Sequence, residues 1–148
     1  AEETGEFTQS KGQEVMESLL KKHKDDIDVV YCENDNEAFG AIDAITAAGK
    51  TVGTGKDDIL VMSFDSTKTG LTDVKDGKII LDTECNPLHG PRVEEIIKAL
   101  EAGETPEKQQ YVDEEIFAAV EDVDSVKVED QDYSVTVVTD DVIKGRAY

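Results

Sequence analysis

The sequence contains few of the residues on which several function classes depend. It has no tryptophan, 5% aromatic residues, two histidines and two cysteines among 148 residues. Cys32 and Cys85 are too few for a disulfide framework and lack the Cys-x-x-Cys spacing of metal and redox motifs. His23 and His89 show no spacing typical of a zinc protease or a serine hydrolase. We therefore predict no enzymatic activity, no metal site and no cofactor.

Positive charge and long apolar segments are scarce as well. Fifteen Lys and Arg residues against 35 Asp and Glu residues give a formal net charge of −20 at pH 7. Such a charge repels nucleic acid and anionic membranes, so we expect no nucleic-acid partner. No apolar run approaches the length of a membrane span, and Ala1 to Gly5 does not resemble a signal peptide. We expect a chain that is either cytosolic or separated from its targeting segment.

The sequence does contain a repeated alternation of β-rich and helical patterns. Strands are predicted at Val29–Cys32, Ile59–Phe64 and Lys78–Thr83, and a helical pattern follows each of them. Val29, Val30 and Tyr31 suit a buried strand. Alternation of this kind is typical of a parallel sheet covered by helices, and the length fits one domain. The sequence therefore predicts an α/β fold with three adjacent parallel strands.

Four helical patterns accompany these strands. One runs from Ser10 to Lys24, a second begins at Glu37 and ends at Gly49, and a third covers Thr69–Lys75. A fourth follows the turn at Pro87–Arg92 and ends at Gly103. In this fourth helix we expect the apolar residues to face inward, namely Val93, Ile96, Ile97 and Leu100.

The last third of the sequence is less regular. Gln109–Val112 has the composition of a strand, whereas Glu114–Lys127 is acidic and has no clear period. Tyr133–Val138 alternates as a strand does, and Thr139 is placed to cap a short final helix that ends near Arg146.

Polar side chains follow each of the three predicted parallel strands. Asn34 follows the first strand, Asp65 the second, and the turn Glu84–Asn86 the third. The carboxyl ends of parallel strands meet at one edge of a sheet, where ligands of α/β proteins bind. Carboxylate and amide groups there can bind adjacent hydroxyls of a sugar, although each residue alone could equally cap a turn or helix. Phe7 either packs against the start of its helix or stacks on a ligand.

Three stretches together are similar to one known family: FTQSKGQEVMESLLKKHKDDIDVVYCENDNEAFGAIDAITAAGK, VMSFDST and DGKIILDTECNPLHGP. The chain resembles the C-terminal part of a type I periplasmic sugar-binding protein of bacterial ABC importers, in the ribose- and galactose-binding family. It is most similar to galactofuranose-binding proteins, through FTQSKGQEVMES, the ECNP turn and the closing Arg-Ala-Tyr. The resemblance covers about Thr4 to Phe117 and resumes at Thr139 to Tyr148.

The resemblance implies a role for each candidate residue. Phe7 would stack on the sugar ring, and Asn34 and Asp65 would hydrogen-bond its hydroxyls. Ribose-binding members carry a glutamine two residues before the proline of the third turn, where this chain has Cys85. We expect no equivalent hydrogen bond from Cys85, and its neighbours Glu84 and Asn86 are the candidates to replace it.

The resemblance also implies a three-layer parallel-sheet lobe of the type I fold, present here as an incomplete fragment. Family members have two lobes that close on a monosaccharide, and nothing before Phe7 in this sequence corresponds to the first lobe. We expect weak or undetectable sugar binding by the chain alone. The expected partners are the sugar, the membrane permease, the missing N-terminal lobe and a second copy of the chain. We interpret 118–138 as an insertion, and expect an extracytoplasmic location, in a periplasm or as a Gram-positive surface lipoprotein.

The main alternative is the effector-binding core of a LacI-type transcription regulator, which shares this fold and both the Asn-Asp and Phe-Asp motifs. The strong negative charge disfavours this alternative, because a regulator works next to DNA. A small flavodoxin-like enzyme or signalling domain would need catalytic groups that the sequence does not provide.

Overall fold

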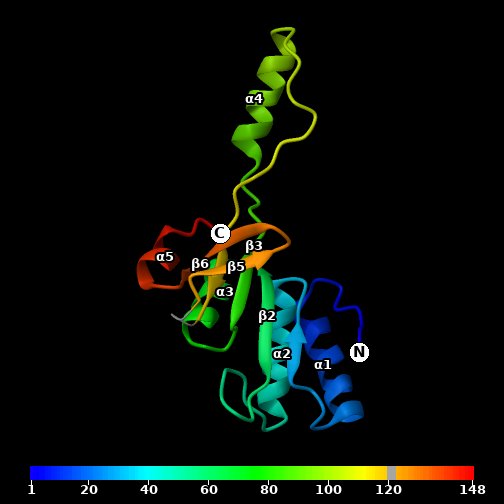
Figure 1. The fold of residues 1–148 in the computed structure, drawn as a ribbon. Coiled ribbons are helices and arrows are strands. Elements are labelled where there is room, and N and C mark those ends of the chain that lie inside the picture. Colours follow the sequence, from blue (N-terminus) through cyan, green and yellow to red (C-terminus); the bar gives the residue numbers. More distant parts are fainter. Residues whose placement is uncertain (120–122) are drawn as a thin grey trace.

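The structure, a computed structural model, describes residues 1–119 and 123–148 (Figure 1). None of the helices in these ranges is both long and apolar enough to cross a bilayer. The elements follow in the order α1 (Gln9–His23), β1 (Val29–Tyr31), α2 (Asp35–Ala47), β2 (Leu60–Asp65), α3 (Lys68–Lys75), β3 (Leu81–Glu84), α4 (Gly90–Glu101), β4 (Ile116–Ala118), β5 (Ser125–Val128), β6 (Gln131–Val137) and α5 (Asp140–Gly145).

One sheet organises the molecule, with the strand order β1-β2-β3-β4-β6-β5. β1 pairs with β2, and β2 with β3, in parallel, which confirms the three adjacent parallel strands predicted from the sequence. β3 begins at Leu81 rather than at Lys78. The reason is that the amides of Lys78 and Ile79 both donate to the Asp73 carbonyl and close the turn after α3 instead of pairing with β2.

The prediction that Val29, Val30 and Tyr31 form a buried strand is wrong, because β1 is the outermost strand of the sheet on its side. Val29 and Tyr31 are 49% and 57% exposed. The core lies instead between the sheet and its helices, where α1 packs on α2 and α2 on β2. Gly40 permits the close contact of α1 and α2, because a Cβ atom there would lie 2.0 Å from the Gln9 carbonyl oxygen.

The prediction that the apolar residues of α4 face inward is also wrong. α4 extends away from the sheet (Figure 1) and contains no buried residue. Val93, Ile97 and Leu100 are 49%, 49% and 57% exposed, and Ile96 is half-buried. The apolar period correctly indicates an amphipathic helix, but no described element lies against its apolar side.

The predicted strand at Gln109–Val112 is irregular, because this segment returns beside α4 and meets no strand to pair with. Tyr111 is 81% exposed, and its carbonyl accepts a hydrogen bond of 2.9 Å from Arg92 of α4. The next strand, β4, begins at Ile116 and runs antiparallel to β3.

The last strand, β6, and the last helix, α5, match the sequence predictions, whereas β4 and β5 were not predicted. β5 and β6 form a hairpin that joins the sheet where β6 runs parallel to β4. α5 begins after Thr139, whose hydroxyl accepts a bond of 3.3 Å from the Val142 amide. The hairpin lies in 118–138, of which residues 120–122 are outside the described ranges, and the interpretation of this segment as an insertion stays a prediction.

Candidate functional site

The carboxyl ends of β1, β2 and β3 lie side by side at one edge of the sheet. This follows from the parallel pairing, in which Val30 is opposite Val61 and Asp65 is opposite Glu84. Asn34, Asp65 and the turn Glu84–Asn86 therefore follow one another along this edge. Within the described ranges, no group of three or more His, Cys, Asp or Glu side chains is arranged to hold a metal ion.

Asn34 connects the start of α2 to the segment before α1. Its Oδ1 accepts a hydrogen bond of 2.8 Å from the Glu37 amide, and its Nδ2 donates one of 3.2 Å to the Phe7 carbonyl. Glu37 adds a second connection, because its carboxylate accepts from the amides of Phe7 (2.9 Å) and Glu33 (3.3 Å). These two hydrogen bonds occupy one acceptor position and one N–H of the Asn34 side chain. Its amide group retains a second N–H and a second lone pair for a ligand.

Phe7 is held beside Asn34 with its side chain in solvent. The residue is 63% exposed, and φ values of 52° at Glu6 and 57° at Phe7 place the turn in the left-handed region. The backbone N–H and carbonyl of Phe7 are both hydrogen-bonded, so the backbone that carries the ring is held in place. An exposed aromatic ring next to polar groups offers an apolar face for a flat ligand.

Asp65 presents a carboxylate that the rest of the chain does not use. Among the described residues, no side chain or backbone group donates a hydrogen bond to either of its side-chain oxygens. Partial burial, and then the charge of Asp35, raise the pKa of Asp65 above its ordinary value. A partly buried, unpaired carboxylate at the carboxyl end of a strand is available to hydroxyl donors of a ligand.

Glu84 differs from Asp65 because its carboxylate is bound inside the protein. Oε1 accepts from a guanidinium nitrogen of Arg146 (2.6 Å) and from the Tyr148 hydroxyl (2.7 Å), and Oε2 accepts from the Glu115 amide (3.0 Å). Burial alone would raise the pKa of Glu84, but the hydrogen bonds from Tyr148, Arg146 and the Glu115 amide outweigh it and lower the pKa. Glu84 therefore connects β3 to the C-terminal residues.

In the third turn, Cys85 is exposed and Asn86 is half-buried. Burial and the neighbouring carboxylates, Glu114 first among them, raise the pKa of the Cys85 thiol, so that it stays neutral. The side-chain oxygen of Asn86 accepts a hydrogen bond of 2.8 Å from the backbone amide of Leu88. The backbone amide of Asn86 donates one of 3.0 Å to the Glu114 carboxylate. The side-chain nitrogen of Asn86 remains available to a ligand.

Sequence reasoning missed several residues that shape this edge: Asp35, Glu37, Asp82, Arg146 and Tyr148. Asp82 gave a usable signal, because it is a charged residue within the apolar run KIILDT. An acidic side chain at an inward strand position has to be paired or protonated. Glu84 and Arg146 are 62 residues apart, and no local pattern relates them.

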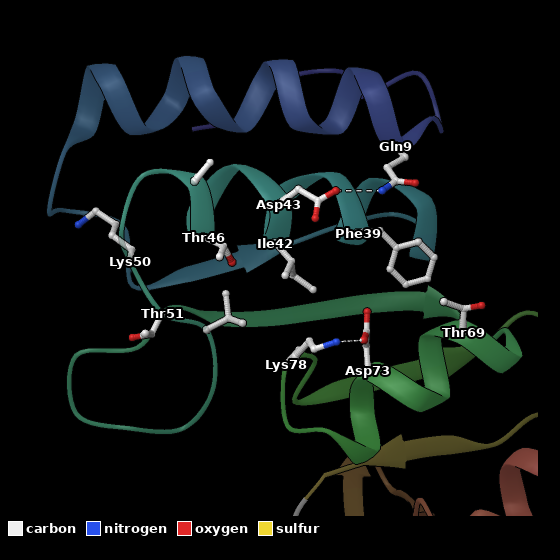
Figure 2. A pocket seen from close by; sticks show the side chains of 12 residues that line it. Gln9, Phe39, Ile42, Asp43, Thr46, Lys50, Thr51, Thr69, Asp73 and Lys78 are labelled. Atoms are coloured by element: carbon white, nitrogen blue, oxygen red, sulfur yellow. Dashed lines mark hydrogen bonds and ion pairs between the residues drawn. The ribbon is translucent and has the colours of Figure 1, made fainter.

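A separate groove of about 860 Å³ lies between α2, the segment at 50–52 and α3 (Figure 2). Its two lysines form ion pairs, whereas Asp43 is hydrogen-bonded to the neutral side chain of Gln9. Asp73 binds Lys78 at 2.5 Å, Asp43 accepts from Gln9 at 3.0 Å, and Lys50 binds Asp25 at 2.6 Å. Both lysines of the groove are thus ion-paired, and Asp43 is its one carboxylate without a cation partner among the described residues.

Comparison with known protein families identifies relatives of this chain. The family model described as "Periplasmic binding protein domain" matches residues 1–81. The ribose import binding protein of Bacillus subtilis is 35% identical over 111 residues, which cover 66% of this chain and 34% of that protein. The galactofuranose-binding protein of Escherichia coli is 38% identical over 109 residues, covering 72% and 33%. The chain spans about a third of the length of these curated relatives.

Solved structures extend this similarity to three dimensions. A Mycobacterium smegmatis protein in complex with β-D-fucofuranose is 40% identical, with a TM-score of 0.72, over 79% of this chain and 37% of that one. The binding component of the arabinose ABC transporter from Shewanella sp. ANA-3, bound to L-arabinofuranose, is 32% identical with a TM-score of 0.70, over 79% and 38%.

Proposed function

The chain belongs to the periplasmic binding protein family, and from this we propose that it is part of the solute-binding component of a bacterial ABC sugar importer. The α/β lobe of the type I fold that the sequence predicted is confirmed by the solved relatives. The named curated relatives are sugar-binding transport proteins, which favours binding over catalysis and an importer over a transcription regulator.

The unpaired carboxylate of Asp65 is the observation that carries the proposed binding site. Asp65 lies on the same sheet edge as Asn34, which retains a free donor and acceptor, and Phe7 is held beside Asn34. We assign to Asp65 and Asn34 the hydrogen bonds to sugar hydroxyls, and to Phe7 an apolar contact with the ring. In the third turn, Asn86 is chemically the best candidate, because the carboxylate of Glu84 is already bound by Arg146.

We propose a monosaccharide in its furanose form as the ligand class. Two related structures hold fucofuranose and arabinofuranose, and a curated relative is named for galactofuranose. Carboxylate and amide groups that lie side by side suit the adjacent hydroxyls of such a ring.

The remaining contacts of the sugar are proposed to come from a part of the protein outside this sequence. The exposed edge of β1 and the apolar side of α4 are surfaces that such a part could cover, and a second copy of the chain is the alternative. The importer's permease and an extracytoplasmic location follow from the same proposal.

Calorimetric titration of the intact gene product that contains this sequence tests the proposal. The panel should contain galactofuranose, arabinose, ribose and fructose, with sucrose as a control that is too large for a monosaccharide cleft. We expect one or more of the monosaccharides to bind and sucrose not to bind. Absence of heat with every sugar would refute the proposed function.

A further inference from the structure

Two carboxyl groups are buried together beneath the candidate site. Asp35, in the first turn of α2, is 1% exposed, and Asp82, in β3, is fully buried. The two carboxyl groups are neighbours, because the Ser66 amide donates to Asp82 and the amide of the next residue, Thr67, donates to Asp35. Among the described residues, no lysine or arginine forms an ion pair with either of them, so the pair is not neutralised by a cation.

Asp35 is surrounded by donors. Its Oδ1 accepts a hydrogen bond of 2.7 Å from the Ser63 hydroxyl, and its Oδ2 accepts bonds of 2.8 Å and 2.6 Å from the amide and hydroxyl of Thr67. The N-terminus of α2 adds a favourable dipole. The space is tightly fitted, since a Cβ atom on Gly70 would lie 2.2 Å from Oδ2. Both oxygens of Asp35 thus accept hydrogen bonds from the surrounding chain.

Asp82 has the surroundings of a protonated acid. Its Oδ1 accepts a hydrogen bond of 3.1 Å from the Ser66 amide, whereas its buried Oδ2 has no donor partner in the part of the chain that the structure describes. A proton on Asp82 converts this unsatisfied acceptor into a donor to Asp35. Burial, and then the charge of Asp35, raise the pKa of Asp82 to about 8.

The two acids hold consecutive residues of one strained turn. Asp65 and Ser66 have φ values of 105° and 53°, a region that residues with a side chain rarely adopt. The turn is kept there by bonds from the Ser66 amide to Asp82 and from Thr67 to Asp35. The orientation of the Asp65 carboxylate therefore depends on both buried acids.

We infer that Asp35 and Asp82 share one proton and act as a positioning pair that fixes the turn 65–67 and, with it, the ligand-facing carboxylate of Asp65. The effect on sugar affinity rests on the proposed function, whereas the shared proton and the fixed turn do not. Above the pH at which the shared proton leaves, two negative charges face each other in a buried space and the turn loosens.

The charged groups around the pair do not offset this repulsion. On the same face of β3, Glu84 is bound to Arg146, and Asp65 on the turn adds further negative charge. α2 contributes Glu37, which is occupied by backbone amides, and α3 contributes Lys68, which is exposed. The other charged groups of α3 are paired at the surface, Asp73 with Lys78 and Lys75 with Asp140. β4 contains no charged residue.

Asp82→Asn in the intact gene product tests the pair, because asparagine keeps the acceptor for Ser66 but cannot ionise. Asp57→Asn, the same change at an exposed position, is the matched control. At pH 6 we expect an infrared carbonyl band of a buried, protonated carboxylic acid in the wild type and in the control. The band should be absent from Asp82→Asn. A wild type without the band, or a variant that retains it, would overturn the inference.

Sugar affinity measured from pH 6 to pH 9 gives the second readout. At pH 9, one pH unit above the pKa of Asp82, only about one tenth of the wild-type protein keeps the shared proton. If only this protonated form binds well, the sugar affinity of the wild type should fall about tenfold between pH 7 and pH 9. Asp82→Asn should bind with constant affinity over this range, and a profile parallel to the wild type would contradict the positioning role. If Asp82→Asn does not fold, Asp82→Thr, whose hydroxyl can accept from Ser66, takes its place.

Amide hydrogen exchange separates this inference from the proposed function. If no sugar binds, the proposed function fails, but exchange at Ser66 and Thr67 still reports on the turn. Relative to Asp82→Asn, these amides should be protected below pH 8 and should lose protection above it in the wild type. Equal exchange in both proteins at every pH would refute the inference.

Discussion

The helices in the chain up to β3 and helix α4 in the chain beyond it bury their apolar residues to very different extents, although β4 of this second part places Phe117 in the core. In the first part, α2 and α3 place Ile45, Leu71 and Val74 in the core with no exposed surface. In the second part, α4 has a similar apolar period but no buried residue. A period in the sequence thus identifies the apolar side of a helix, while burial depends on whether the fold supplies a partner for that side.

Truncating one isoleucine in each part tests this difference and has the largest expected effect. Ile45→Ala should lower the free energy of unfolding by about 2–5 kcal/mol, because it leaves a cavity in a closed core. Ile97→Ala, the same change on exposed α4, should lower it by less than about 0.5 kcal/mol. Urea denaturation of the 148-residue chain measures both.

A large loss from Ile97→Ala in the 148-residue chain would contradict the contrast between the two parts. A loss of stability that appears only in the longer gene product would instead support the contrast, because the apolar side of α4 would then be covered by a segment outside this sequence.

The same contrast explains what sequence reasoning could and could not predict. The parallel order of β1, β2 and β3, the cap at Asn34 and the strand-end position of Asp65 follow from local patterns and from the rules of strand–helix alternation. The exposure of Tyr31 and of α4 does not, because it depends on neighbours that their own segments do not specify. The pairing of Asp35 with Asp82 required the register of two strands and the start of a helix.

Asp65→Ala is expected to separate ligand binding from stability within the first part. The change removes an acceptor of sugar hydroxyls, which should cost about 1.5–3 kcal/mol of binding free energy, or a roughly ten- to hundredfold loss of affinity. Stability should barely change, because no described residue donates to this carboxylate. Calorimetry and thermal denaturation of the intact gene product measure the two effects.

Asp57→Ala, at an exposed position away from the strand edge, is the control for Asp65→Ala. Unchanged affinity in Asp65→Ala, for a sugar that binds the wild type, would show that Asp65 is not a ligand residue. Loss of folding would show that its carboxylate stabilises the turn.

The bond between Glu84 and Arg146 is where the second part is held most closely to the first. Both side chains are largely buried, and the interaction joins β3 to the segment after α5. Glu84→Gln should lower the free energy of unfolding by about 1–2 kcal/mol at pH 7, since the side-chain amide keeps an acceptor for Tyr148 but loses the charge that pairs with Arg146 and the acceptor for the Glu115 amide. Urea denaturation of Glu84→Gln beside Glu101→Gln, the same change at an exposed position, measures it.

The pH dependence of this difference identifies charge as its cause. The pKa of Glu84 is lowered in the folded state by its bonds to Tyr148 and Arg146. Its contribution to stability is therefore complete above the unfolded pKa of about 4.3 and is lost as the pH falls through the lower, folded pKa. The gap between the wild type and Glu84→Gln should shrink as the pH falls from 5 to 3. A gap that stays constant would mean that the shape of the glutamate, rather than its charge, holds the C-terminal residues against β3.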